Sequence, residues 1–191
     1  MVDRVLFVCH ANLCRSPMAE YIARRLLADQ PVLVASAGTD AHDDLAMHPY
    51  AAEIAAGTGA DPRAFRSRRL RAEYLAGATV VLTATRRQRS LCTALAPAAL
   101  HRTFTLRQFG RLAAAAGTAP DPVAPVRGGT VGPLRSAVEA AARARGRLQP
   151  AAADADDLVD PVGGSAADFR RCAEEIERAM RPLAALIRTA G

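Results

Sequence analysis

Two patterns of apolar residues alternate along the chain. Short unbroken apolar runs, rich in valine and leucine, predict buried strands at residues 4–8, 32–35, 79–83 and 103–106. Elsewhere apolar residues recur at steps of three and four, which predicts helices at residues 18–27, 48–56, 86–95, 107–116 and 165–188. Strands that alternate with helices are typical of an α/β fold, in which helices cover both faces of a parallel sheet.

Residues 117–157 depart from this alternation. The segment is rich in Ala, Pro, Gly and Arg, and its first part, GTAPDPVAPVRGGTVGP, is typical of a loop. Residues 134–145 have the spacing of a helix, and we expect the remainder to be flexible. The pattern therefore predicts a single domain over residues 1–191, with a flexible or partly helical insertion at about 117–157.

The first predicted strand leads into the segment CHANLCRSP at residues 9–17. Cys9 follows the strand, and five residues separate it from Arg15, where Pro17 indicates the first turn of a helix. A loop of this length can turn its backbone N–H groups toward an anion, and the positive end of a helix adds to the attraction. Arg15 can bind two phosphate oxygens at once, and the same field favours the thiolate of Cys9. Residues 9–16, here named the phosphate loop, therefore predict a phosphate site with its own nucleophile.

Charge and aromatic content argue against a nucleic-acid partner. The formal net charge is +6, and the chain contains no lysine, so arginine carries all of the fixed positive charge. A basic surface attracts either nucleic acid or phosphorylated substrates. The arginines are scattered along the chain, and only 4% of the residues are aromatic, so few side chains are able to stack on bases.

The four cysteines, Cys9, Cys14, Cys92 and Cys172, are too few and too scattered for a disulfide framework. They have no zinc-site spacing, so we predict no metal and no cofactor. No apolar run approaches the roughly 18 residues of a membrane span, and the N-terminus lacks the features of a signal peptide. We therefore expect a cytoplasmic protein without a membrane partner.

Several motifs together carry a resemblance to a known family. The segment VCHANLCRSPMAE resembles the N-terminal signature of the low-molecular-weight protein tyrosine phosphatases, and SAGT at residues 36–39 follows at the usual distance. TATRRQR at residues 83–89 and the Asp160-Pro161 pair resemble further segments of that family. The resemblance implies a flavodoxin-like sheet of order 2-1-3-4, with Cys9 at the carboxyl end of the first strand.

The resemblance also implies a role for each site residue. Cys9 would attack phosphorus and form a phosphocysteine, Arg15 would bind the phosphoryl oxygens, and Asp160 would protonate the leaving group without the help of a metal. Ser16 would donate a hydrogen bond to the thiolate, while Asn12 and Ser36 would hold the loop in shape. The phosphate-binding residues would be His10, Ala11, Asn12, Leu13, Cys14, Arg15 and Ser16.

The chain departs from the family pattern at two positions. Ala11 stands where glycine is usual, and a positive φ there would cost about 1 kcal/mol or more. Val162 follows the Asp-Pro pair, where an aromatic residue often walls the phosphotyrosine ring. His10 is a large polar neighbour of the nucleophile and is expected to shape the entrance.

Other residues have competing interpretations. Cys14 is either a redox partner that protects Cys9 as a reversible disulfide or a small buried side chain. Cys92 and Cys172 fit helical apolar faces, so we expect them in the core, and His48, before Pro49, is expected to cap a helix. Two larger sets also stay open: the acids Asp154, Asp156 and Asp157, which compete with Asp160, and the arginines Arg63, Arg66, Arg68, Arg69 and Arg71, which form a solvated face or a patch for acidic substrates.

Three alternatives to a protein tyrosine phosphatase remain. An arsenate reductase of the same fold that couples to thioredoxin would need two further cysteines to relay a disulfide, and only Cys92 lies near the third strand and the helix after it. A reductase that uses an external small thiol would not need them and stays open. A protein that binds a phosphorylated partner without turnover would not need Cys9, Arg15 and Asp160 together. A small phosphomonoester as substrate would keep the same chemistry and residues.

Overall fold

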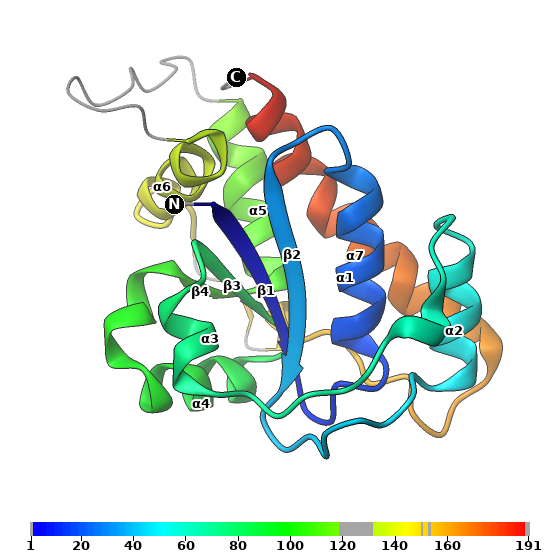
Figure 1. The fold of residues 1–191 in the computed structure, drawn as a ribbon. Coiled ribbons are helices and arrows are strands. Elements are labelled where there is room, and N and C mark those ends of the chain that lie inside the picture. Colours follow the sequence, from blue (N-terminus) through cyan, green and yellow to red (C-terminus); the bar gives the residue numbers. More distant parts are fainter. Residues whose placement is uncertain (1, 119–131, 150, 153, 190–191) are drawn as a thin grey trace.

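The computed structural model describes residues 2–118, 132–149, 151, 152 and 154–189. Its strands form one parallel sheet (Figure 1): β1 (Asp3–Cys9), β2 (Val32–Gly38), β3 (Val80–Thr83) and β4 (Thr103–Thr105). The order across the sheet is β2-β1-β3-β4, which confirms the expected topology. β1 is central, and its Val5 pairs with Val34 on one side and with Val80 on the other.

The helices begin and end close to the predicted positions. They are α1 (Arg15–Leu26), α2 (Pro49–Ala56), α3 (Ala72–Ala76), α4 (Arg86–Leu95), α5 (Leu106–Gly117), α6 (Pro133–Ala144) and α7 (Ala166–Thr189), with short 3₁₀ turns η1 (Pro62–Ala64), η2 (Pro97–Arg102) and η3 (Asp154–Asp156). The short helix α3 and the 3₁₀ turns were not predicted. His48 caps α2 as expected, because its Nδ1 accepts a hydrogen bond from the Tyr50 N–H.

Helices cover both faces of the sheet, as the apolar strands predict. Val5 and Phe7 of β1 face the larger core, which they share with α1, α2, α5, α6 and α7. Leu6 and Val8 face the smaller core, to which α3, α4 and η2 contribute. β1 is therefore buried from both sides, and its last residue, Cys9, is only 3% exposed.

The segment between α5 and α7 contributes to this core. The helix predicted at residues 134–145 is α6, and it packs Leu134, Val138 and Ala141 into the larger core against α5 and α7. Residues 119–131 lie outside the described part of the chain, so the loop expected there stays a prediction. Among the described residues, no helix combines the length and apolar character needed to cross a bilayer.

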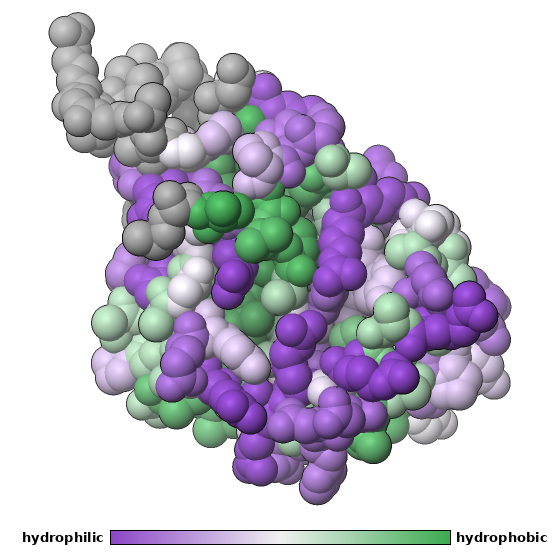
Figure 2. Space-filling model, viewed as in Figure 1, coloured by the Kyte–Doolittle hydropathy of each residue, from purple (hydrophilic) through white to green (hydrophobic). Residues whose placement is uncertain are grey.

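The carboxyl ends of the parallel strands meet at the lower edge of the molecule as drawn in Figure 1. Figure 2 shows mostly hydrophilic residues at this edge, whereas hydrophobic surface gathers higher up, toward the middle of the view. Ligands of open α/β sheets bind beyond the carboxyl ends of the strands, where Cys9 ends β1.

Candidate active site

The phosphate loop joins the end of β1 to the start of α1. Cys9 is the last residue of the strand, and Arg15 is the first residue of the helix. Asn12 adopts a left-handed backbone with φ of 55°, a conformation that asparagine tolerates better than most residues. Ala11 has no positive φ, so the conformational cost considered for that position does not arise.

A buried hydrogen-bond network fixes the loop from below. Asn12 Oδ1 accepts the backbone N–H of Arg68 at 2.9 Å, so the amide nitrogen of Asn12 points the other way. That nitrogen donates to Ser16 Oγ and to Ser36 Oγ, each at 2.9 Å. Ser16 Oγ also lies 2.9 Å from Cys9 Sγ. Ser16 accepts from Asn12, so its own proton can be donated to the Cys9 sulfur at 2.9 Å or to the more distant Ala37 carbonyl oxygen at 3.4 Å.

Glu20 completes this network, and sequence reasoning missed it. The side chain is 1% exposed, and its Oε2 accepts a hydrogen bond from Ser36 Oγ at 2.5 Å. Arg24, one helical turn later, pairs with its other carboxylate oxygen. Since a carboxylate only accepts hydrogen bonds, Glu20 fixes the direction in which Ser36 donates. The available signal was spacing: Glu20 stands four residues after Ser16, on the same face of α1.

Gly38, at the end of β2, allows the phosphate loop to approach the sheet closely. A Cβ atom there would lie 2.4 Å from the His10 carbonyl oxygen and 2.8 Å from the Asn12 backbone nitrogen. Real Cβ atoms do not approach backbone so closely, so only glycine fits without moving the loop. The SAGT segment therefore supplies both Ser36 and the space that the loop needs.

The arrangement suits an anion. Within the described residues, no backbone carbonyl accepts a hydrogen bond from the N–H groups of residues 10–16. The first turn of α1 contains no acidic residue to compete with an anion at its positive end. Arg15 is 6% exposed, so its guanidinium is held beside the loop instead of extending into solvent. Together these donors can surround a phosphoryl group next to Cys9.

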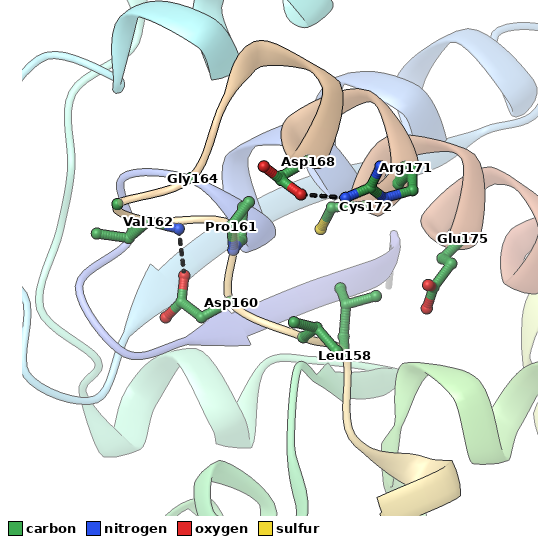
Figure 3. Close-up of a pocket in the computed structure, with 11 residues that line it drawn as sticks. Leu158, Asp160, Pro161, Val162, Gly164, Asp168, Arg171, Cys172 and Glu175 are labelled. Carbon is green, nitrogen blue, oxygen red and sulfur yellow. Dashed lines mark hydrogen bonds and ion pairs between the residues drawn. The ribbon is translucent and has the colours of Figure 1, made fainter.

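The second part of the site is the segment of residues 158–164, here named the acid loop. Arg15 donates to the Leu158 carbonyl oxygen at 3.2 Å and forms an ion pair with Asp160. The other oxygen of Asp160 accepts the N–H of Val162 at 3.2 Å, as Figure 3 shows. The Asp160 side chain remains 45% exposed, so it faces both Arg15 and solvent. The structure thus brings Arg15 and Asp160 together across 145 residues of sequence.

The remaining loop residues differ in exposure. The His10 side chain is 57% exposed and lies 3.8 Å from Asp40, which is consistent with a place at the entrance. Leu13 is half-buried, and its carbonyl oxygen accepts the N–H of His48. Cys14 is a buried free thiol. Burial, together with the charge expected on Cys9, raises the pKa of Cys14 to about 12, so Cys14 is protonated near neutrality.

Neither Asp156 nor Asp157 lies beside the phosphate loop. Asp156 is buried between Arg86 and Arg111, and Asp157 accepts the backbone N–H of Arg86. Both carboxylates are therefore engaged by other groups, which leaves Asp160 as the acid that meets Arg15.

The arginine cluster, Cys92 and Cys172 do not take part in the contacts between Cys9, Arg15 and Asp160. Three arginines of the basic cluster, Arg63, Arg69 and Arg71, are well exposed and face Asp61, Asp40 and Asp43, as expected of a solvated face. Cys92 and Cys172 are buried free thiols of the core, as predicted. Cys172 also lines a cleft of about 450 Å³ between the acid loop and α7 (Figure 3), and none of the cleft's lining residues comes from the phosphate loop.

Comparison with known proteins agrees with this geometry. The model of the family described as low molecular weight phosphotyrosine protein phosphatase matches residues 4–143. The chain belongs to this family. It is a cysteine-dependent phosphatase, and an arsenate reductase is not favoured. The match includes the phosphate loop and ends before Asp160, so the acid loop is interpreted from its contacts.

Individual relatives carry two kinds of name. A protein-arginine-phosphatase of Geobacillus stearothermophilus is 36% identical over 109 residues, covering 57% of this chain and 72% of the relative. The low molecular weight protein-tyrosine-phosphatase Etp of Escherichia coli K12 is 32% identical over 110 residues, covering 56% and 71%. Among solved structures, the YwlE arginine phosphatase from Geobacillus stearothermophilus superposes with a TM-score of 0.69 at 28% identity, covering 98% of this chain and 94% of that one.

Proposed function

We propose that this phosphatase hydrolyses phosphotyrosine in proteins through a phosphocysteine intermediate. Cys9 is the nucleophile, Arg15 holds the phosphoryl oxygens and Asp160 is the general acid. The observation that carries the proposal is one cluster: Ser16 Oγ contacts Cys9 Sγ, while Arg15, at the start of the same helix, contacts Asp160. Nucleophile, anion clamp and acid therefore converge on one end of α1.

In the first step, the Cys9 thiolate attacks phosphorus, and the bond between phosphorus and the leaving oxygen breaks. Two phosphoryl oxygens take the place of Asp160 on the guanidinium of Arg15. Asp160, carrying a proton, then transfers it to the leaving phenolate. The amide groups of residues 10–16 bind the phosphoryl oxygens as negative charge develops on them.

In the second step, water attacks the phosphocysteine. Asp160, now a carboxylate, accepts a proton from that water, and the bond between sulfur and phosphorus breaks. The products are inorganic phosphate and the Cys9 thiolate, which the Ser16 hydroxyl stabilises as a leaving group. No step requires a metal or another cofactor, because protein groups supply every proton and charge.

The choice of phosphotyrosine over phosphoarginine rests on the apolar side chains beside the catalytic groups. Leu13 lies in the phosphate loop, and Val162, which is 61% exposed, is next but one to Asp160 on the acid loop. A phenyl ring can pack against both, whereas the N–H groups of a phosphoarginine would need acceptors that neither side chain offers. The relatives named as arginine phosphatases make phosphoarginine the second candidate.

A substrate panel tests this choice. We expect a higher kcat/KM for a phosphotyrosine peptide than for the same peptide with phosphoarginine, and a lower one for a small alkyl phosphate. Preference for phosphoarginine would replace the proposed substrate but leave the nucleophile and clamp unchanged. Preference for the alkyl phosphate would indicate a small-molecule phosphatase.

We also propose that the protein acts in the cytoplasm. The support is chemical: Cys9, Cys14, Cys92 and Cys172 are all free, and a nucleophilic thiolate needs a reducing compartment. Fractionation of the source cells with an antibody against the protein tests the location.

A further inference from the structure

We propose that Asp156 is a positioning residue for catalysis, which fixes the start of the acid loop and so holds Asp160 against Arg15. The inference rests on the proposed role of Asp160 as general acid. It assigns a function to a carboxylate that the reaction does not use and that lies four residues before the acid.

Asp156 joins two helices through one buried carboxylate. Its side chain is 3% exposed, and its Oδ2 accepts hydrogen bonds from Arg86 at 2.7 and 3.1 Å. Its Oδ1 pairs with Arg111. Arg86 begins α4, and Arg111 lies in the middle of α5. A buried carboxylate with both oxygens paired resists displacement, because moving it would leave its buried charge without its two arginine partners.

The residues after Asp156 continue the attachment. Asp157 accepts the backbone N–H of Arg86 with its side chain at 2.8 Å and a bond from Arg107 with its carbonyl oxygen at 3.0 Å. Leu158 donates its N–H to the Ala84 carbonyl oxygen at 2.8 Å, just beyond β3. Residues 156–158 are thus bound to the sheet and to two helices, and these contacts form an anchor on rigid elements.

After Leu158 most of the acid loop is exposed, and Pro161 is its one further buried residue. Val159 is 73% exposed, Val162 is 61% exposed, and Gly163 has a positive φ of 81°. Asp160 stands two residues beyond the anchor, and its described side-chain contacts are with Arg15 and the Val162 N–H. Asp160 therefore lies between the anchor and the buried Pro161, and the direction in which the chain leaves the anchor helps to set where the acid lies. A displacement of about 1 Å at a catalytic group can cost about a hundredfold in rate.

The test separates positioning from mere stability by using two leaving groups. Asp156→Asn keeps the shape of the side chain but weakens both arginine contacts. We expect turnover of phenyl phosphate, a poor leaving group, to fall about tenfold to a hundredfold. Turnover of 4-nitrophenyl phosphate, which needs little protonation, should fall much less. An equal loss with both esters would overturn the proposal, because a general loss of folded enzyme affects both alike.

A double variant sharpens the result. If Asp156 acts through Asp160, Asp156→Asn should add no further loss of phenyl phosphate turnover when Asp160 is already Asn. The same loss in both backgrounds would contradict the proposal. If Asp160→Asn alone showed no dependence on the leaving group, the acid assignment itself would fail and this inference with it. If Asp160→Asn shows that dependence and Asp156→Asn does not, only this inference fails.

Two further variants serve as a control for Asp156→Asn and as a substitute for it. Asp154→Asn is the matched control, because Asp154 is an exposed acid in the same 3₁₀ turn, and we expect unchanged turnover of both esters. Arg111→Gln removes one arm of the anchor and leaves the hydrogen bonds of Arg86, so it serves if Asp156→Asn does not fold. It should give the same dependence on the leaving group with a smaller loss, and an equal loss with both esters would again overturn the proposal.

Discussion

The phosphate loop and the acid loop together form the candidate active site, but different contacts hold each of them in place. The phosphate loop is held by a buried hydrogen-bond network of Asn12, Ser16 and Ser36, which ends on the buried carboxylate of Glu20. The acid loop is exposed along most of its length, and the charged groups that hold it lie at one end, around Asp156.

This difference follows from what each loop must do. The phosphate loop has to present fixed N–H groups to a developing charge, and a preorganised site does this without rearrangement. The acid loop has to let a bulky substrate enter, exchange a proton and then admit water. An exposed tip on a rigid base meets these needs, and exposed catalytic loops commonly lie on such scaffolds. The two loops should therefore respond differently to substitution.

The largest effect is expected at the nucleophile. Cys9→Ser should lower turnover by about a thousandfold or more, because a hydroxyl is a much poorer nucleophile at neutral pH. Binding of inorganic phosphate should persist, since Arg15 and the backbone amides remain. Single-turnover kinetics and calorimetric titration with phosphate measure the two properties separately.

The matched control for this variant is Cys92→Ser, at a buried core thiol on α4, far from the reaction. We expect it to affect stability more than chemistry. Appreciable turnover by Cys9→Ser would refute a covalent mechanism at this residue.

The next effect concerns the acid loop. Asp160→Asn should slow hydrolysis of a phosphotyrosine peptide by about a hundredfold or more, because a phenolate leaves poorly without a proton. The loss with 4-nitrophenyl phosphate should be clearly smaller. Steady-state kinetics with both substrates measure the two losses, and a loss of equal size with both would contradict the assignment of Asp160 as the acid.

The fold was largely predictable from the sequence because its signals are local. Four short apolar runs and the helical spacing between them correspond to β1–β4 and to α1, α2, α4, α5, α6 and α7. The short helix α3 was missed, since five residues show too little periodicity to stand out from a loop. The sheet order came from the family resemblance, because no local pattern says which strands are neighbours.

The candidate site was predictable where its residues belong to a short sequence motif. Cys9, Arg15 and Ser16 share one loop, and the Asp-Pro pair marked Asp160. Contacts between distant segments were not predictable. Spacing places Glu20 on the helix face of Ser16 but does not show its contact with Ser36, nor the approach of Gly38 to the loop, nor the place of Asp156 between two arginines. Their importance depends on which side chains the fold brings into contact, and sequence spacing alone does not record this.

A smaller effect is expected from crowding the phosphate loop. Gly38→Ala would force its new Cβ atom against the His10 carbonyl oxygen, because the present backbone would leave only 2.4 Å between these two atoms. The loop would have to move, and we expect a loss of roughly 1–3 kcal/mol in the free energy of unfolding. Weaker phosphate binding should accompany it, because the amide groups of residues 10–16 shift together.

Gly117→Ala is the control for this variant. Gly117 is the last residue of α5, and a Cβ atom there would make an ordinary contact of 3.6 Å with Leu186. Chemical denaturation and phosphate titration of both variants give the comparison. Unchanged phosphate affinity in Gly38→Ala would mean that the loop tolerates movement and is less preorganised than its buried network indicates.

The smallest effect on the resting enzyme is expected at Cys14. Its thiol is not used in hydrolysis, so Cys14→Ala should leave turnover close to the wild type before oxidation. After mild peroxide, the Cys9 thiolate becomes a sulfenic acid, and the Cys14 thiolate can attack its sulfur and release hydroxide to form a disulfide. The reaction needs ionised Cys14. With its pKa raised to about 12, only a very small fraction of the Cys14 thiol is ionised at pH 7.

Oxidation itself changes this balance. The charge of Cys9 raises the pKa of Cys14, and a neutral sulfenic acid removes that contribution while burial remains. We therefore expect the disulfide to form slowly, at a rate that rises with pH between 6 and 9. Mass spectrometry of samples trapped at successive times measures this rate. Full recovery by a thiol reductant should be lost in Cys14→Ala, where the sulfenic acid proceeds to irreversible forms. Equal recovery in both proteins would show that the buried Cys14 is a packing residue and that the phosphate loop lacks a protective partner.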